Sequence, residues 1–499
     1  MLDIIFCALP YSNLDNIYSA PAVLKGVVCE HGYSARTRDF GCDLLNLCNR
    51  DGDLFYRVQN YFLTAVESDG VIEQFYSDAV EFFINNPSRY IGISVLSIYT
   101  HRCVLELLQR LKQAGVESKV IIGGHGLTTP VYPPIRPRFN FSGLEQTVHF
   151  VDLLQRRNLV DHVIIGDGED AILNLLQTQQ DTVAQQYSET FRYPVPNYDD
   201  YNLKDYLIPL DQINFPVTGS KGCVRDCDFC DVKSKFGNFR YRSGTDIANE
   251  MIEVSSKTGI YKFQFTDSLV NGGLKPFREF LTVMARHNQQ HPEQAIQWNG
   301  SYICRPQNQA PQDLYELIAL SGGQGLAIGA ESGSNRVLQA MNKKTTVEAL
   351  YHELEQFRKH GITCILLMIV GHWSESWEDF VEHCEMLVKI TPYVRSGTIS
   401  AVRLGDIAML LHGSPSYDNR ERNQVVVSEF NPQHIWQCEQ YPDNTYKERV
   451  YRRLIVSRLA ERLRIPTVSN AEIFITVANM IDQQHQEINQ FYESVTKNF

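Results

Sequence analysis

The sequence predicts an α/β protein built from two successive regions of alternating strands and helices, followed by a mainly helical C-terminal region. Short apolar segments alternate with amphipathic patterns over residues 1–180 and again over residues 214–403. Residues 181–213 between them lack this periodicity, and residues 404–499 are predicted to be mainly helical. A chain of 499 residues exceeds one ordinary hydrophobic core, so two or three domains are expected.

Residues 1–180 are predicted to form a doubly wound, Rossmann-like domain. Its apolar strands are expected at Leu2–Ala8, Tyr90–Val95, Lys119–Ile122 and Val163–Ile165. Helical spacing is seen between the second and third strands, at Val104, Leu107, Leu108 and Leu111. Alternating strands and helices imply a parallel sheet that is covered on both faces. Ligands of such sheets bind beyond the carboxyl ends of the strands.

The loops at these strand ends supply candidate binding residues. Ser94 and Leu96 follow one strand, Gly123 and Gly124 follow the next, and Gly168 follows the last. Glycines without side chains let a ligand approach the backbone. All five also suit ordinary turns of any doubly wound sheet. The lone histidines nearby, His101 and His125, are expected to have structural roles.

Residues 181–213 are predicted to be an inter-domain linker, because Gln and Thr are frequent and Pro194 and Pro196 interrupt the chain. Six strands are then expected within residues 214–403. They are Asn214–Gly219, Tyr261–Thr266, Ala295–Ser301, Gly325–Gly329, Ile362–Ile369 and Gly397–Arg403. In a parallel barrel the chemistry lies at the carboxyl ends of the strands. The loop that follows the first of these strands is therefore the first place to look for a site.

That loop contains three closely spaced cysteines, Cys223, Cys227 and Cys230, in a CxxxCxxC run. Zinc sites and [4Fe–4S] clusters both normally use four protein ligands. This run offers three, so a cluster held here would keep one iron open for a small molecule. A zinc site with three cysteines is the alternative. The remaining nine cysteines are expected to stay reduced in a long chain without a secretory signal.

The cysteine run resembles the signature of radical S-adenosylmethionine (radical SAM) enzymes, including the aromatic Phe229 before the third cysteine. The resemblance implies that Cys223, Cys227 and Cys230 are metal ligands and catalytic residues, and that the open iron chelates SAM. Reductive cleavage of SAM would then give a 5′-deoxyadenosyl radical. It also implies that residues 214–403 form a partial (β/α)6 barrel.

The same resemblance assigns further residues to SAM. Glu331 and Ser332 belong to a segment similar to the G-x-E-S-G-S … M-x-K motif of cobalamin-type radical SAM proteins. Glu331 is expected to accept from the ribose or ammonium, and Arg305 to pair with the methionyl carboxylate. Asp267 and Ser268 are expected at the amino group or ribose. The alternative for the acidic residues is a helix N-cap.

The N-terminal domain resembles the cobalamin-binding domain that precedes such barrels. Ser94-Val-Leu96 and Gly123-Gly124 resemble the S-x-L … G-G half of its fingerprint, and Gly166-Asp-Gly168-Glu169 resembles its G-E-G-E turn. The D-x-H-x-x-G half is missing. At the corresponding spacing stands Leu47–Gly52, where only the glycine fits. Either cobalamin binds without a protein histidine, or this domain does not bind it.

The C-terminal region carries a turn at Gly413-Ser414-Pro415 that is similar to the P-G-[ST] turn closing these barrels. Residues 446–464 are rich in Arg and Lys, which predicts a solvated basic face or a site for an anionic substrate or acidic partner. Gly371–Glu375 resembles a G-x-P-x-E turn of the family, with His372 and Trp373 departing from it. Substrate choice is expected to lie in this region.

The bulk composition limits the function. The net charge of −12 argues against a large nucleic-acid surface, and no apolar run approaches a membrane span. We expect a cytoplasmic enzyme that uses a [4Fe–4S] cluster, SAM and cobalamin to methylate an unactivated carbon. A small molecule or peptide is the expected substrate, and flavodoxin or ferredoxin the expected electron donor. The alternatives are a radical SAM enzyme without functional cobalamin (rearrangement, oxidation or sulfur insertion), whose N-terminal domain is a structural cap, and a non-catalytic zinc-binding scaffold.

Overall fold

The computed structural model describes residues 1–11, 14, 16–66, 70–127, 149–178, 191–305, 311–428 and 433–468. The chain divides into two compact units. The N-terminal unit comprises Met1–Pro216 and Asn249–Lys262, and the barrel unit comprises Val217–Ala248 and Phe263–Phe499. Parts of the predicted linker and of the C-terminal region, residues 181–190 and 469–499, lie outside the described residues.

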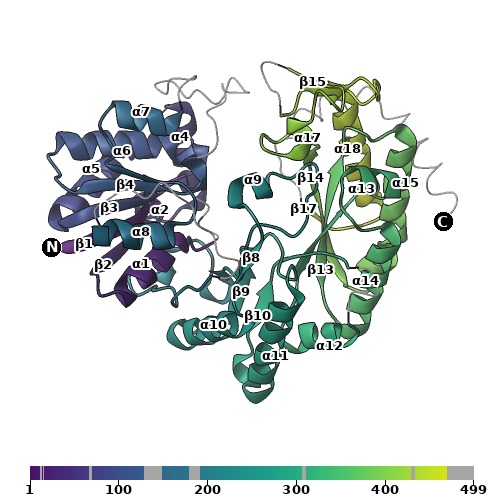
Figure 1. Cartoon of the computed structure of the whole chain (residues 1–499), viewed down its shortest axis with the longest axis horizontal. Helices are drawn as coiled ribbons and strands as arrows, with labels where there is room; N and C mark the ends of the chain where they lie inside the picture. Colours follow the sequence, from purple (N-terminus) through teal and green to yellow (C-terminus); the bar gives the residue numbers. More distant parts are fainter. Residues whose placement is uncertain are drawn as a thin grey trace. The chain divides into compact units, whose positions relative to one another are not determined.

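The N-terminal unit is built on a five-stranded sheet with the order β2-β1-β3-β4-β5, in which every pair of neighbours is parallel (Figure 1). The strands are β1 Leu2–Ala8, β2 Ala35–Asp39, β3 Ser88–Ser94, β4 Lys119–Gly123 and β5 His162–Ile164. The helices are α1 Ala20–Glu30, α2 Phe40–Leu47, α3 Gly52–Gln59, α4 Tyr61–Thr64, α5 Ile72–Asn85, α6 His101–Gln113, α7 Phe150–Arg156 and α8 Gly168–Thr178. This is the predicted doubly wound class.

One core of this unit lies between the sheet and two helices. Ile4, Phe6, Tyr90 and Ile121 project from the strands onto apolar residues of α1 and α8, among them Val28, Ile172 and Leu176. Burial of such side chains is the main favourable term in folding. Because all five strands are parallel, their carboxyl ends lie at the same edge of the sheet. The loops after β3, β4 and β5 at this edge carry the residues predicted to bind a ligand.

The barrel unit continues the alternation with two sheets, ordered β10-β9-β6 and β11-β12-β13-β14-β17. Their strands are β6 Phe215–Val217, β9 Lys262–Phe265, β10 Gln297–Asn299, β11 Ser301–Tyr302, β12 Leu326–Glu331, β13 Cys364–Val370, β14 Ile399–Ile407 and β17 Thr467–Val468. Neighbours from β11 to β17 are parallel. Only Gly300 separates β10 from β11, so the sheets follow one another in chain order as an open barrel.

Helices alternate with the strands of this barrel along the chain, as the sequence predicts (Figure 1). They are α9 Val232–Phe236, α10 Gly244–Thr258, α11 Leu274–Gln290, α12 Asp313–Leu320, α13 Asn335–Ala340, α14 Val347–His360, α15 Trp377–Lys389 and α16 Thr391–Arg395. A short antiparallel pair, β7 Ser220–Lys221 and β8 Arg240–Tyr241, flanks the cysteine loop. The six predicted strands therefore all exist, with their ends shifted by a few residues.

The described C-terminal residues are more varied than a purely helical region. Besides α17 Pro415–Asp418 and α18 Tyr446–Arg462, they form an antiparallel pair of β15 Val425–Val427 and β16 Trp436–Cys438. The predicted boundary at residue 404 lies inside β14. Strand β17 then pairs with β14 at Val402 and Arg403.

The prediction of a solvated basic face on α18 was wrong for its three central arginines. Arg449, Arg452 and Arg453 are at most 2% exposed. Their guanidinium groups donate to backbone carbonyls, including Trp436 O and Gly405 O. They therefore stabilise the packing of α18 on the barrel and offer no anion site.

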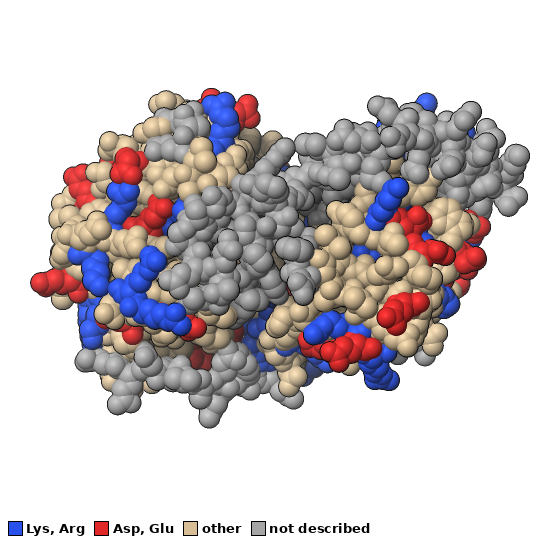
Figure 2. Space-filling view, turned by 90° about the horizontal axis from the view of Figure 1, so that it is seen from above, with Lys and Arg blue, Asp and Glu red and all other residues tan. Residues whose placement is uncertain are grey.

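Charges of both signs are mixed on one face of the molecule. On the face drawn in Figure 2, Lys and Arg side chains lie beside Asp and Glu side chains on both units. Within the described ranges, no helix has the length and apolar character needed to cross a membrane.

Candidate functional site

The three cysteines lie on one loop between β7 and α9. Gly222, which precedes Cys223, has a φ of +76°, and a Cβ placed there would stand 2.7 Å from the carbonyl oxygen of Asn238. Only glycine suits both the left-handed backbone and this close approach. The β7–β8 pair therefore fixes the direction in which the cysteine loop leaves the barrel.

The loop is also tied to the segment that follows α13. The backbone N–H of Asp228 donates to Met341 O at 3.0 Å, and Asn342 Nδ2 donates to Asp226 O at 2.7 Å. Phe229 packs beside Met341 and Leu338 in an apolar cluster. The cysteine loop and the segment after α13 therefore lie side by side.

Cys227 is buried, and Cys223 and Cys230 are half-buried. Burial raises the pKa of all three and takes that of Cys227 to about 12, although the charge of Lys343 partly opposes the shift. Metal binding must remove these protons. In the described part of the chain, no three Cys, His, Asp or Glu side chains already stand as a metal-ligand set. The donor chemistry nevertheless fits a cluster, since three thiols lie on one eight-residue loop and influence each other's charge.

Glu331 and Lys343 form a buried ion pair beside this loop. Lys343 Nζ lies 2.6 Å from Glu331 Oε1, and the side chains are 11% and 9% exposed. Burial lowers the pKa of Lys343, but the charges of Glu331 and Cys227 outweigh that effect and raise it overall. The ammonium also lies 5.7 Å from the centre of the Phe229 ring. Glu331 does not cap a helix, because the N-cap of α13 is Ser334.

Asp267, which follows β9, hydrogen-bonds to the segment that leads from β6 to β7, just before the cysteine loop. Its carboxylate accepts from the backbone N–H of Gly219 at 2.8 Å and from the Ser220 hydroxyl at 2.6 Å. Burial raises its pKa to about 7, although these hydrogen bonds lower it. The helix-cap alternative is wrong for Asp267, because the next helix, α11, has Gly273 as its N-cap. Ser268 beside it is half-buried.

Two other residues predicted to bind SAM make local contacts. Arg305 donates to the carbonyl oxygens of Asn271 and Gly272 at 2.5 and 2.9 Å, so it holds the loop after β9. Ser332 is fully buried, and its hydroxyl accepts from Ser334 N at 3.2 Å. These contacts give both residues a structural role.

A small apolar cavity of about 220 Å³ opens beside the cysteine loop. Phe229 lines it from the loop, Ile369 from β13 and Ile407 from β14, and Trp373 and Trp436 complete its aromatic wall. Its position next to the cysteines and its apolar lining suit a flat heteroaromatic ring.

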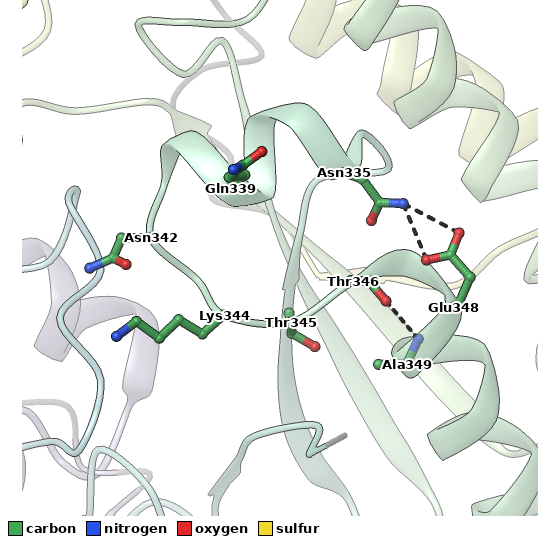
Figure 3. A pocket seen from close by; sticks show the side chains of 8 residues that line it. All are labelled: Asn335, Gln339, Asn342, Lys344, Thr345, Thr346, Glu348 and Ala349. Carbon is green, nitrogen blue, oxygen red and sulfur yellow. Dashed lines mark hydrogen bonds between the residues drawn. The ribbon is translucent and has the colours of Figure 1, made fainter. Parts of the chain in front are cut away.

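A larger cavity of about 650 Å³ lies at α13 and the start of α14, as Figure 3 shows. Asn335 donates to Glu348 at 3.2 Å, and the Thr346 hydroxyl accepts from Ala349 N as the N-cap of α14. Asn342 and Lys344 lie at the opposite end of the view (Figure 3). The contacts among its lining residues stabilise the start of the helix.

The carboxyl edge of the N-terminal sheet holds the residues predicted for cobalamin. Ser94 hydrogen-bonds with the Tyr18 hydroxyl at 2.8 Å, and Leu96 is 48% exposed. Gly124 has a φ of +110°, and a Cβ there would lie 2.5 Å from Val95 O. The packing against the loop after β3 therefore requires glycine at position 124. Gly123 ends β4, and Gly168 begins α8.

Leu47–Gly52 is not at this edge. It follows α2 and not a strand, and Arg50 within it donates to Lys204 O and Tyr206 O. Residues 9–19, which follow β1, contain no histidine. His101 is buried, with Nε2 2.9 Å from Gly126 O and its ring stacked on Phe150, and burial lowers its pKa to about 4. The structural role expected for His101 is confirmed.

Sequence reasoning missed several residues of the site. Asp228, His372 and Trp373 meet at the cysteine loop although 144 positions separate Asp228 from His372. Lys343 is the lysine of the M-x-K motif, but its role at the site was not predicted. The available signals were this motif and the likeness of Gly371–Glu375 to the G-x-P-x-E turn, which pointed to His372 and Trp373 without giving them a role.

The comparison with known families now identifies the barrel. Residues 217–387 match the model of the radical SAM superfamily. The chain carries a radical SAM domain. Such a domain uses a [4Fe–4S] cluster and SAM, which argues against the zinc scaffold. The cysteine loop lies within this domain.

Similar proteins extend this comparison. Bacteriochlorophyllide d C-12(1)-methyltransferase of Chlorobaculum tepidum is 30% identical over 33% of this chain and 35% of that protein. The chain spans about half or less of the length of the first curated relatives it matches.

Two solved structures resemble this chain over most of its length. The radical SAM methyltransferase TsrM from Kitasatospora setae, with cobalamin and a [4Fe–4S] cluster bound, matches with a TM-score of 0.61 and 13% identity over 89% of this chain and 81% of that one. The cobalamin-dependent enzyme OxsB with aqua-cobalamin bound matches with a TM-score of 0.64 and 12% identity over 99% of this chain and 72% of that one. At this identity the likeness shows the fold.

Proposed function

We propose that this radical SAM enzyme is cobalamin-dependent and methylates an unactivated carbon. The observation that carries the proposal is the combination of a three-cysteine loop on the barrel with a parallel β2-β1-β3-β4-β5 sheet in the preceding unit. Both TsrM and OxsB, which share the fold, are described with bound cobalamin. The name of the Chlorobaculum relative supports methyl transfer.

The barrel unit supplies the residues for the cluster and SAM. Cys223, Cys227 and Cys230 would hold the [4Fe–4S] cluster, which supplies the electron that cleaves SAM. Lys343 and Glu331 place one charge of each sign beside the loop, suited to the carboxylate and ammonium of SAM. The apolar cavity at Phe229 would take the adenine ring and exclude water from it.

The N-terminal unit supplies a surface for a large, partly apolar cofactor. Leu96, Tyr99 and Ile165 are 48%, 42% and 47% exposed in the loops after β3 and β5. Exposed apolar side chains that gather at one sheet edge are typical of a binding surface. Since the loop after β1 has no histidine and His101 is buried, cobalt would be held without a histidine from these positions.

The remaining partners are part of the proposal. The mixed surface charge in Figure 2 and the net charge of −12 favour a small molecule or peptide over a nucleic acid as substrate. A one-electron donor such as flavodoxin or ferredoxin would reduce the cluster. A reducing cytoplasm would suit both donor and cluster.

Anaerobic reconstitution tests the proposal. The chain is loaded with iron, sulfide and hydroxocobalamin, desalted, and analysed for metal, cobalamin and 5′-deoxyadenosine formed from SAM. We expect near-stoichiometric cluster and cobalamin. Cys227→Ala should lose the brown colour and the 5′-deoxyadenosine, whereas Cys29→Ala, outside the loop, should keep both. Loss of cobalamin on desalting would contradict the proposal that the enzyme is a cobalamin-dependent methylase.

The second candidate is a radical SAM enzyme without cobalamin, with the N-terminal unit as a structural cap. One observation favours it: the packing against Val95 already requires glycine at position 124. In the same reconstitution this candidate predicts 5′-deoxyadenosine production that is equal with and without hydroxocobalamin.

A further inference from the structure

Asp228, which lies between Cys227 and Cys230, is held through every one of its polar groups. Its backbone N–H donates to Met341 O, and its carbonyl accepts from Ser416 N at 2.7 Å. Its carboxylate accepts from His372 Nε2 at 3.0 Å and from Trp373 Nε1 at 2.8 Å. Three segments far apart in the sequence therefore converge on one residue of the cysteine loop.

The hydrogen-bond partners determine the direction of each bond. An ionised carboxylate and a carbonyl can only accept, so His372 Nε2 carries the proton that bonds to Asp228. His372 Nδ1 lies 2.9 Å from the Ser374 hydroxyl and 3.4 Å from Ser374 N, so it accepts from Ser374. The imidazole is 2% exposed. Both of its nitrogens are used, and its orientation is fixed.

The turn that carries His372 is itself held by the C-terminal helix. Arg452 Nη1 donates to Glu375 Oε1 at 3.0 Å, and the same oxygen accepts from Gly371 N at 3.1 Å. Asn444 Nδ2 donates to His372 O at 2.7 Å. A continuous series of buried contacts thus leads from α18 through the turn to the cysteine loop.

We propose that His372 and Trp373 are positioning residues for the cluster. They hold the cysteine loop through the carboxylate of Asp228, so that the three thiolates and the open iron face SAM in one orientation. Neither residue touches SAM through this contact. The inference rests on the radical SAM site and does not depend on cobalamin. Residues that orient metal ligands from behind typically change metal affinity or activity by 10–100-fold when they are removed.

Two substitutions at His372 separate its two hydrogen bonds. His372→Gln keeps a donor near the Nε2 position and loses the Nδ1 acceptor, whereas His372→Asn keeps a group near Nδ1 and does not reach Asp228. Trp373→Phe removes the indole N–H and keeps an aromatic, although smaller, ring at the cavity wall. His291→Asn, at an exposed site after α11, is the matched control.

The readouts are iron content, the electron paramagnetic resonance spectrum of the reduced cluster with and without SAM, and the Kd for SAM. Thermal unfolding of the cluster-free chain checks folding. We expect His372→Asn and Trp373→Phe to assemble a cluster, to lose the uniform SAM-induced spectral change, and to raise the Kd for SAM about tenfold. His372→Gln and His291→Asn should stay within about twofold of the wild-type Kd.

Spectra and Kd values equal to wild type in both His372→Asn and Trp373→Phe would overturn the inference. So would a defect in His372→Gln as large as that in His372→Asn, because the Asp228 contact would then not be the one that matters. A wild-type chain that forms no cluster would instead contradict the assigned radical SAM function. The two failures are therefore distinguishable.

Discussion

Lys343 and Glu331 form a buried ion pair with 2.6 Å between Nζ and Oε1, directly beside the loop that carries the three cysteines. Breaking a buried pair by removing one partner leaves an uncompensated charge, which typically costs about 3–5 kcal/mol. Lys343→Met should therefore destabilise the cluster-free barrel unit by roughly 3 kcal/mol. Denaturant unfolding of the single variants and of Lys343→Met/Glu331→Gln measures the coupling.

Lys344→Met is the matched control for this prediction. Lys344 is the exposed neighbour of Lys343 in the chain. Its substitution should change stability by no more than about 0.5 kcal/mol. Equal effects of the two substitutions would show that the buried pair has no special importance.

Gly371 begins the turn that carries His372, and it should not tolerate a side chain. Its φ is +80°, and a Cβ would lie 2.4 Å from Arg449 Cγ. Gly361 has a φ of +67° with open space around its Cβ position. Gly361→Ala should cost only the left-handed backbone strain, about 1 kcal/mol. Gly371→Ala should lower the thermal unfolding midpoint clearly further, and equal shifts would contradict the packing argument.

Glu353 makes stability depend on pH. It is fully buried and accepts from the hydroxyls of Tyr302 and Tyr315, and burial raises its pKa from 4.5 to about 7. A raised carboxyl pKa means that the native state holds the proton more tightly. The contribution of Glu353 to the free energy of unfolding is therefore fully present below pH 4.5 and is lost as the pH rises to about 7.

Glu353→Gln removes this dependence and leaves the other titrating groups in place. Relative to wild type, the variant should gain roughly 1–3 kcal/mol between pH 5 and pH 8. Parallel denaturant titrations at the two pH values measure the difference. A difference that does not change with pH would contradict the raised pKa.

His383 should have the opposite pH dependence. It is fully buried on α15, and burial lowers its pKa from 6.5 to about 4. Within the described residues, neither ring nitrogen has a hydrogen-bond partner. The contribution of His383 to the free energy of unfolding is therefore fully present above pH 6.5 and is lost as the pH falls to about 4.

Replacing His383 by leucine removes two unsatisfied buried polar atoms. His383→Leu should stabilise the barrel unit by about 1 kcal/mol at pH 7 and by more at pH 5. Thermal unfolding at both pH values is the measurement. Destabilisation at pH 5 would mean that the imidazole has a partner in the folded protein.

The fold was largely predictable because most strands are short apolar segments. Leu2–Ala8 was placed without error, while β2 was missed because Ala35–Asp39 contains three charged residues. The strand lies at the edge of its sheet, and only Thr37 is fully buried. An edge strand with one buried face needs few apolar residues, so its pattern resembles a loop.

The site was predictable only where it is local in sequence. The three cysteines lie within eight residues, so their spacing alone identified them. Asp228, His372 and Trp373 meet through the barrel topology, and no local pattern connects them. Arg449 and Arg453 of α18 were misjudged because their partners are backbone carbonyls, such as Leu404 O and Gly405 O, which every sequence has. Arg452 was misjudged because its partner, Glu375, lies 77 positions away in the chain.

Strand β17 gives the barrel a protected end. It is only two residues long, but its pairing with β14 covers the backbone of Val402 and Arg403, and Pro466 O accepts from Val402 N. A chain cut after residue 407 would leave β14 as an open edge beside an apolar β13. Open edges of this kind template association between chains. We therefore expect a fragment of the barrel that ends before β17 to associate more readily than a fragment that includes Thr467 and Val468.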